Sequence, residues 1–328
     1  MKWPQVAVVV PTHDHPETLE LSVASVLEQD FADLTVIVIA DGVTDESRSV
    51  LSRLKRADHR VQVIDRPKSP RHAEVVRHEV LSTPGFSPLV VYHGDDDLML
   101  PDHVSTMVAL LAEYDFAHPL PLLVLPDDTP EYRPADLARP ASIDWHLGQP
   151  WRNAISLTGV AHTLDSYRRL PHGWRETPPG RWTDHYMWQQ FFLSPGFRGV
   201  TSPKATTIKI VTEPGMPDAR EVRRRRIASW WQRMHAPGFR QEWDDEVAAA
   251  VRSAALTYVL EFTRLQEAHE ALTEAHRQLE VDVVHCGQQL AEAVEQNRQL
   301  DLDVAGMAHS RSWRMTAPLR AVTRRLPR

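Results

Sequence analysis

The strongest constraint on the fold is a series of short, mostly apolar segments that recur through the first 125 residues. Four of them, at 6–10, 34–40, 61–64 and 89–92, are rich in Val and Ile. Continuous apolar runs of this length are typical of strands that are buried on both faces of a parallel sheet. A fifth apolar run at 120–125 predicts a further strand.

Segments with apolar residues at helical spacing separate these strands, at 16–29, 45–57, 71–82 and 101–114. Thr44 precedes the second of them and can cap it. Strands that alternate with helices predict an α/β fold with a mostly parallel sheet and helices on both faces. In such sheets, ligands bind beyond the carboxyl ends of the strands.

Polar and acidic residues follow three of the predicted strands, at 12–14, 41–42 and 95–97. Their convergence at one sheet edge indicates a ligand site. Asp95, Asp96 and Asp97 are adjacent like charges, which are tolerated in solvent or beside a divalent cation. Carboxylates favour hard ions such as Mg²⁺ and Mn²⁺, whose remaining positions accept water and phosphate oxygens.

Residues 129–245 are less regular and contain many Pro, Gly, Trp and Arg residues. Within them, an aromatic-rich segment at 174–192 surrounds Asp184. Aromatic side chains here are consistent with a pocket for a flat or sugar-like ligand, and equally with a small satellite core. We therefore divide the globular part into a first half at 1–128 and a second half at 129–245.

The segment 246–308 lacks Pro and follows a heptad pattern, which predicts a long helix in a coiled coil. The a and d positions of this heptad form an apolar stripe along the helix, which must pack against either a second copy or the globular part of the same chain. His269 and His276 occupy position a of the heptad, where they are either metal ligands or simply tolerated polar residues. Asn297, also at an a position, can fix a two-stranded register. We expect a parallel homodimer through 262–307.

The last segment, 309–328, contains six Arg and no acidic residue, and one helical face can carry Trp313, Leu319, Val322 and Leu326. A basic amphipathic helix of this kind is typical of a membrane-surface or partner-docking element. The alternative is a solvated terminus.

Composition excludes several classes of protein. The net charge of −7 argues against a general nucleic-acid binder, and the single Cys286 rules out an intrachain disulfide framework or a multi-cysteine zinc site. No stretch reaches 18 consecutive apolar residues, as a membrane span would need. We expect a cytoplasmic protein, peripheral on the inner face of the cytoplasmic membrane if 309–328 binds there.

Four segments resemble, in order, the motifs of family-2 glycosyltransferases of the GT-A fold. They read VAVVVPTHDHPETLELSVASVLEQD, VIVIADGVTD, VVYHGDDDLMLPDHV and TDHYMWQQF. The resemblance covers roughly residues 5–210. The later segment SRSWRMTAPLR resembles the ends of some bacterial surface-polysaccharide glycosyltransferases.

The resemblance implies inverting transfer of a sugar from a nucleotide-diphosphate sugar to a saccharide or lipid-linked acceptor, in polysaccharide or glycoconjugate biosynthesis. Asp184 would be the catalytic base, with Glu176 the next candidate and helix capping the alternative role of Asp184. Asp96 and Asp97 would hold Mg²⁺ or Mn²⁺, with Asp96 favoured as direct ligand. The residues implied for nucleotide-sugar binding are Pro11, Thr12, Asp14, Asp41, Arg71, Arg77 and Asp95.

The chain also departs from the family pattern. Ala40 stands where the family has the first Asp of an Asp-Asp pair, and Gly94 where many members have the first Asp of the metal motif. A non-catalytic sugar-nucleotide-binding scaffold therefore stays open. A nucleotidyltransferase is the other alternative, although the segment 11–18 lacks the Gly-rich loop with a basic residue that such enzymes usually carry after the first strand.

Overall fold

The computed structural model describes residues 3–212 and 218–316 of the chain. It divides into two compact units, Met1–Ala255 and Leu256–Arg328, which are described separately.

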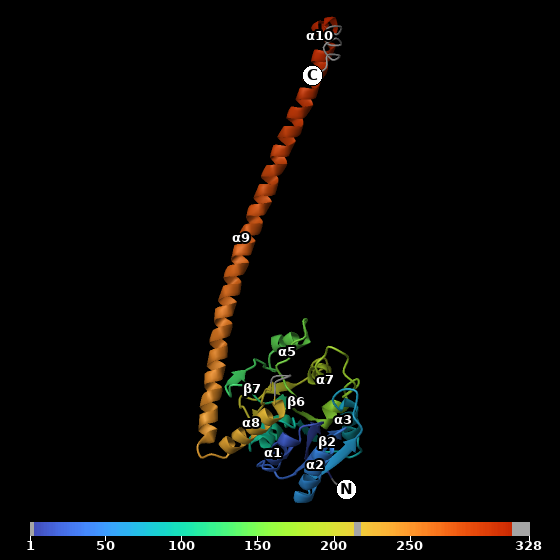
Figure 1. Ribbon diagram of the computed structural model, residues 1–328, viewed down its shortest axis with the longest axis vertical. Coiled ribbons are helices and arrows are strands. Elements are labelled where there is room, and N and C mark those ends of the chain that lie inside the picture. Colours follow the sequence, from blue (N-terminus) through green and yellow to red (C-terminus); the bar gives the residue numbers. More distant parts are fainter. Residues whose placement is uncertain (1–2, 213–217, 317–328) are drawn as a thin grey trace. The chain divides into compact units, whose positions relative to one another are not determined.

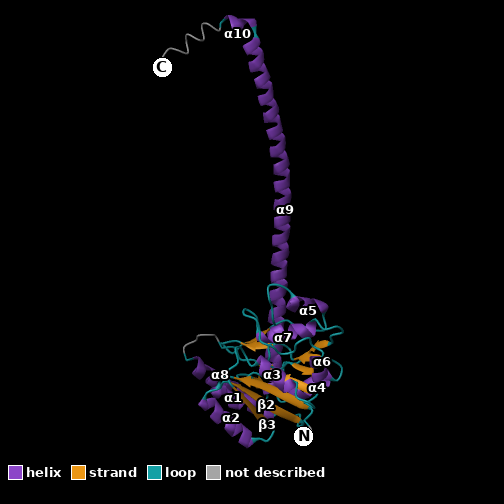
Figure 2. Cartoon of the chain, turned by 90° about the vertical axis from the view of Figure 1, so that its right-hand side faces the viewer, coloured by secondary structure: helices purple, strands orange, loops and turns teal. Residues whose placement is uncertain are grey.

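A mostly parallel sheet forms the centre of the first unit (Figure 2). Strand β9 runs antiparallel to its neighbours β4 and β6, and all other neighbouring strands of this sheet are parallel. The α/β class expected from the sequence is confirmed. The seven described strands lie in the order β10 (Gly199–Thr201), β6 (Phe116–His118), β9 (Ala161–Thr163), β4 (Leu89–Tyr92), β1 (Val6–Thr12), β2 (Leu34–Asp41) and β3 (Val61–Arg66).

Helices cover both faces of this sheet, because successive residues of each buried strand point to opposite sides. Val6, Val8 and Val10 of β1 join one apolar cluster, and Ala7 and Val9 join the other. The first cluster includes residues of α1 (Pro16–Leu27), α2 (Asp45–Ala57) and α4 (His103–Leu111). The second includes residues of α3 (Glu74–Leu81), α6 (Leu164–Arg168) and α7 (Thr183–Phe192), while α5 (Pro140–Leu147) packs partly against it.

Two predicted elements differ from those observed. The helix expected at 71–82 begins at Glu74, because Ala73 adopts a left-handed conformation with φ of 59°. The strand expected at 120–125 is β7 (Leu122–Val124), which pairs antiparallel with β8 (Pro130–Tyr132) outside the central sheet.

A third apolar cluster lies beside the central sheet. The short strands β5 (Leu98–Met99) and β11 (Thr207–Ile208) pair antiparallel. They pack with α8 (Ala219–Met234) and the first turns of α9 (Phe239–His309), where the indole of Trp243 donates a hydrogen bond to the Ala205 carbonyl. Because β5 directly follows the Asp95–Asp97 segment and β11 directly precedes Lys209, this small sheet brings Lys209 to the acidic segment.

The second unit is the helical continuation of α9, followed by α10 (Arg311–Met315) (Figure 1). The predicted long C-terminal helix is confirmed. Each residue from 256 to 309 is exposed. Of the basic tail expected at 309–328, residues 317–328 lie outside the described residues. Among the helices described, none combines the length and the apolar character that crossing a bilayer requires.

Candidate active site

A cavity of about 680 Å³ opens at the carboxyl ends of β1, β2 and β4. Strand β1 lies between β2 and β4, so the chain leaves β1 in one direction and returns on its other side, which is where α/β sheets form ligand crevices. Of the residues expected at the site, two do not line this cavity, Asp14 and Asp97. Those that do line it are Pro11, Thr12, Asp41, Arg71, Arg77, Asp95, Asp96 and Asp184.

The three adjacent carboxylates have different environments. Asp95 accepts a hydrogen bond of 3.0 Å from the His15 ring, and this contact raises the pKa of His15. Asp96 keeps part of its carboxylate exposed to the cavity. Asp97 is wholly buried, and its oxygens accept hydrogen bonds from the Thr158 hydroxyl, the Ile210 amide and the Lys209 ammonium.

Lys209 is the internal counter-ion of this acidic segment. Its ammonium lies 3.0 Å from the Asp97 carboxylate and 3.7 Å from that of Asp96. Burial alone would lower the pKa of Lys209, but the two carboxylates outweigh it and the pKa is raised above its ordinary value. The same charge helps to lower the pKa of Asp96, against the effect of burial. Lys209 therefore stays protonated and Asp96 ionised at neutral pH.

Gly94 makes room for this arrangement. A Cβ atom at position 94 would lie 2.6 Å from an Asp97 carboxylate oxygen and 2.9 Å from the Thr158 hydroxyl oxygen. The backbone amide of Gly94 also donates to that hydroxyl at 3.0 Å. The structure thus explains why an acidic side chain is absent here: the space is filled by the Asp97–Thr158 hydrogen bond.

The residues present fit a divalent cation only in part. Among the residues described, no three His, Cys, Asp or Glu side chains gather as a complete ligand set. Asp96, with Asp95 beside it, lines the cavity, and Mg²⁺ is commonly held by one or two carboxylates while phosphate oxygens and water fill the other positions. Asp97 does not suit a ligand role, because its oxygens already accept three protein hydrogen bonds.

Asp41 organises a neighbouring loop. One of its oxygens accepts a hydrogen bond from the Ser69 amide at 2.6 Å, and the other accepts from the Ser69 hydroxyl and from Lys68 at 2.6 Å. Gly42, with φ of 66°, lets the Lys68 backbone approach closely. Asp41 therefore borders the cavity while holding the loop that leads to α3. Asp14 is exposed and accepts a hydrogen bond from Thr44.

Three arginine side chains converge on the cavity. The Arg77 guanidinium is stacked 3.8 Å above the ring of Trp174, and that of Arg181 is 3.5 Å above Trp151. Arg71 donates to the Arg181 carbonyl. In the described part of the chain, each of the three retains a buried Nε without a hydrogen-bond partner. Planar guanidinium groups that line a cavity are suited to bind phosphate oxygens.

Asp184 lines the cavity from the first turn of α7. One of its oxygens accepts a hydrogen bond from the His185 amide at 2.7 Å. Burial raises the pKa of Asp184 above its ordinary value, which suits a group that must accept a proton. Asp184 is not the cap of this helix, since Trp182 occupies the N-cap position. The alternative base, Glu176, is exposed and does not line the cavity.

Sequence reasoning missed several lining residues, including His15, Lys68, Arg181 and Lys209. Lys209 belongs to no recognisable motif, because only the pairing of β5 with β11 places it. The aromatic segment at 174–192 divides between the core and the cavity: Trp174 and Trp188 are buried in the core, whereas Trp182, 54% exposed, lines the cavity.

Comparisons with known proteins identify a family model and two relatives that match part of this chain. Residues 7–163 match the model of glycosyl transferase family 2. A GalNAc(5)-diNAcBac-PP-undecaprenol beta-1,3-glucosyltransferase of Campylobacter jejuni is 29% identical over 115 residues, which are 35% of this chain and 37% of that protein. Glycosyltransferase GlyA of Streptococcus pneumoniae is 24% identical over 110 residues, 34% of this chain and 15% of that protein. The chain thus spans well under half the length of either relative.

Two solved structures have similar folds at low sequence identity. A mannosyltransferase from Pyrobaculum calidifontis in complex with GDP-Man and Mn²⁺ has 15% identity and a TM-score of 0.46, covering 79% of this chain and 80% of that chain. S. aureus TarS 1-349 in complex with UDP-GlcNAc has 15% identity and a TM-score of 0.49, covering 76% of this chain and 72% of that chain.

Proposed function

This chain carries a glycosyl transferase family 2 domain at residues 7–163, and from that premise we propose that it moves a sugar from a nucleotide-diphosphate sugar to a hydroxyl acceptor with inversion. One observation carries the proposal. Arg71, Arg77 and Arg181, each with a buried, unpartnered Nε in the described residues, line the same cavity as the carboxylates Asp96 and Asp184. Such a cavity offers an anion site and a proton acceptor together.

The donor would lie along the strand ends. Pro11, Thr12 and Asp41 border the part of the cavity that we assign to the nucleoside, with the hydroxyl of Thr12 buried and unpartnered among the described residues. The guanidinium groups would bind the diphosphate, whose two charged groups match their free donors. The cation–π contacts with Trp174 and Trp151 hold two of these groups in place before the donor arrives.

Asp96, supported by Asp95, would hold a divalent cation, Mg²⁺ or Mn²⁺. When bound, such an ion neutralises charge that develops on the departing diphosphate. Asp96 is suited to this role because the charge of Lys209 keeps it ionised while its carboxylate faces the cavity.

Asp184 would act on the acceptor. The acceptor oxygen forms the new bond to the anomeric carbon as the bond from that carbon to the diphosphate oxygen breaks, and the hydroxyl proton passes to the Asp184 carboxylate. The configuration at the carbon inverts because attack and departure occur on opposite faces. Since burial raises the pKa of Asp184, its carboxylate is a stronger base than an exposed one.

The acceptor would be a saccharide or a lipid-linked saccharide of bacterial glycoconjugate synthesis. Trp182 borders the cavity two residues before Asp184 and is more than half exposed, so a sugar ring can stack on its indole while a hydroxyl reaches the base. The Campylobacter relative is named for an undecaprenol-PP-linked substrate. We extend to this chain the proposal of a lipid-linked acceptor, reached by peripheral membrane contact through the basic segment 309–328.

The test is a panel of UDP- and GDP-sugars incubated with the protein and Mn²⁺, with release of nucleoside diphosphate measured. We expect slow hydrolysis of a subset of donors, and calorimetric binding of the corresponding diphosphate. Arg71→Gln should weaken that binding, whereas the matched control Arg66→Gln should not, because Arg66 is exposed and outside the cavity. Binding without turnover of any donor would favour the scaffold, and release of pyrophosphate from nucleoside triphosphates would favour a nucleotidyltransferase.

A further inference from the structure

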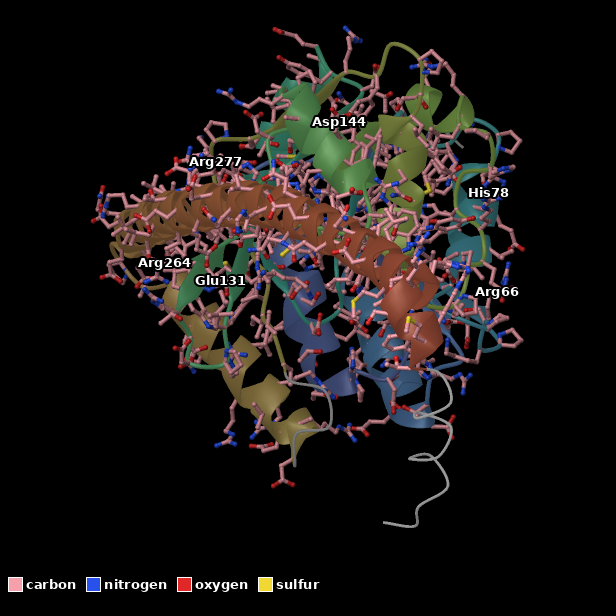
Figure 3. The ribbon with its side chains drawn as sticks, turned by 90° about the horizontal axis from the view of Figure 1, so that it is seen from above. Arg66, His78, Glu131, Asp144, Arg264 and Arg277 are labelled. Carbon is pink, nitrogen blue, oxygen red and sulfur yellow. The ribbon has the colours of Figure 1, made fainter. Side chains whose placement is uncertain are left out.

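The part of α9 from 256 to 309 presents a long apolar stripe to solvent. Leu265, Leu272 and Leu290 are 67–69% exposed, and Phe262 is 63% exposed. Intrinsic helix propensity alone stabilises an isolated helix only weakly in water, and most helical stability in proteins comes from packing an apolar face against a partner. Arg264 and Arg277, labelled in Figure 3, are charged residues of the same helix that lie outside this stripe.

The stripe follows a heptad with two interleaved series, which together we name the seam. Its a positions are Phe262, His269, His276, Val283, Leu290, Asn297 and Val304. Its d positions are Leu265, Leu272, Leu279, Cys286, Ala293, Leu300 and Met307. At about 1.5 Å per residue the seam is about 70 Å long.

We propose that the seam pairs with the seam of a second copy of this chain, in parallel and in register. The polar a residues carry this inference. In a parallel, in-register pair each a residue faces its own copy, so Asn297 meets Asn297, and His269 and His276 likewise meet themselves. Each polar group then has a polar partner across the seam.

The antiparallel pair with the same overlap is unfavourable. There, residue i faces residue 569 − i of the partner helix, so a residues face d residues. Asn297 would meet Leu272, and His269 would meet Leu300. Each such layer buries a polar group against a hydrocarbon side chain without a hydrogen-bond partner, which is costly.

The flanking charges are compatible with the parallel pair. Several acidic residues lie at e and g positions, among them Glu261, Glu280 and Asp282. In a parallel pair each g residue lies beside the e residue five positions later on the partner. By that rule Glu261 lies beside Gln266, and Asp282 beside Gly287, so these acids do not face one another.

The first test is the mass of the full chain in solution, measured by light scattering at micromolar concentration. We expect a dimer, and a monomer for the double variant Leu272→Glu, Leu279→Glu. The matched control is Val281→Glu, Val284→Glu, which adds the same charges to the same helix outside the seam and should remain dimeric. Circular dichroism reports whether each variant keeps its helix. A monomeric wild type, a trimer, or loss of the dimer in the control would overturn the proposal.

The second test decides direction. The native cysteine is first removed by Cys286→Ser, and Met307→Cys is added at one end of the seam. Packed helices bring facing Cα atoms to roughly 4–6 Å, close enough for a disulfide in the parallel pair. In the antiparallel pair the two cysteines would be about 70 Å apart. We expect mild oxidation to cross-link this variant but not the outward control Glu295→Cys in the same background. A dimer in which Met307→Cys fails to cross-link overturns the parallel arrangement.

Discussion

The Lys209 ammonium lies 3.0 Å from the Asp97 carboxylate, which is wholly buried beneath the acidic edge of the candidate active site. The third member of the acidic triplet is therefore neutralised by the protein itself. This leaves Asp96, which faces the cavity, as the carboxylate of the triplet best placed to meet a cation or a ligand.

Removal of one partner of this ion pair should be costly. Lys209→Met leaves the buried Asp97 charge without its counter-ion, and we expect a loss of about 3–5 kcal/mol in the free energy of unfolding. The double variant Lys209→Met, Asp97→Asn removes both charges and should recover a large part of that loss. Urea unfolding of the wild type, of the double variant and of the single variants Lys209→Met and Asp97→Asn completes the cycle. A loss in the double variant equal to the sum of the two single losses would show that the pair is not coupled.

Asp96→Ala should separate binding from folding. Because the Asp96 carboxylate is partly exposed to the cavity, its removal should leave the midpoint of thermal unfolding nearly unchanged. The Mn²⁺-dependent part of UDP or GDP binding, measured by calorimetry, should disappear. Asp97→Asn is the matched comparison and should instead lower the unfolding midpoint, since Asp97 is wholly buried. Nucleotide binding by Asp96→Ala that still responds to Mn²⁺ would move the metal assignment elsewhere.

Asp184→Asn should retain donor binding and lose turnover. The amide keeps the size of the side chain but cannot accept the acceptor proton, so we expect kcat to fall by about 10²–10⁴-fold. The dissociation constant of the nucleoside diphosphate should stay within about twofold of the wild type. Glu176→Gln, an equivalent change at an exposed carboxylate, should be active. If Asp184→Asn turns over like the wild type, another group is the base.

The pH dependence of transfer should also report on Asp184. The base acts when it is deprotonated, so the rate should rise with pH through the pKa of Asp184. Because burial raises that pKa, the acidic limb should lie at higher pH than for an ordinary aspartate. The limb is measured as kcat against pH and should be absent from the residual activity of Asp184→Asn. A limb that persists unchanged in the variant belongs to a different group.

Gly94→Ala tests the close packing beside the triplet. Its Cβ would lie 2.6 Å from an Asp97 oxygen, so the Asp97–Thr158 hydrogen bond must shift. We expect destabilisation of about 1–3 kcal/mol, typical of overpacking. Gly287→Ala in α9 is the control, because a Cβ at that position would have no described atom within 4 Å outside its own stretch of helix. Unfolding curves of the two variants should differ accordingly; equal stability of both would show that the backbone at Gly94 adjusts freely.

Local patterns predicted much of the fold. The helix at 45–57 and the strand at 89–92 occur with the expected bounds, and Thr44 accepts the capping hydrogen bond from Ser47. These features depend on neighbours in sequence: side-chain periodicity, β-branched runs and a cap one residue before the helix. The ends of β1, β2 and β4 likewise meet at one cavity because parallel strands share a carboxyl edge.

Other features could not be predicted, because they depend on contacts between distant segments. The direction of strand β9 depends on its antiparallel pairing with β4 and β6. The three residues of β9 do not by themselves predict whether the strand runs parallel or antiparallel to its neighbours. Asp14 resembles Asp96 as a polar residue after a strand, but its side chain is exposed, accepts a hydrogen bond from Thr44 and lies outside the cavity.

The sequence alone determined the strand–helix alternation, the heptad of the C-terminal helix, and the presence of carboxylates at the strand ends, because each of these features depends only on residues that are close along the chain. Only the tertiary structure decided which carboxylates of the acidic triplet line the cavity. The pairing of β5 with β11 carries Lys209 across more than a hundred residues to Asp97, and Gly94 leaves the space in which Thr158 binds the same group. Asp97 is therefore buried and paired with the charge of Lys209, whereas Asp96 lines the cavity.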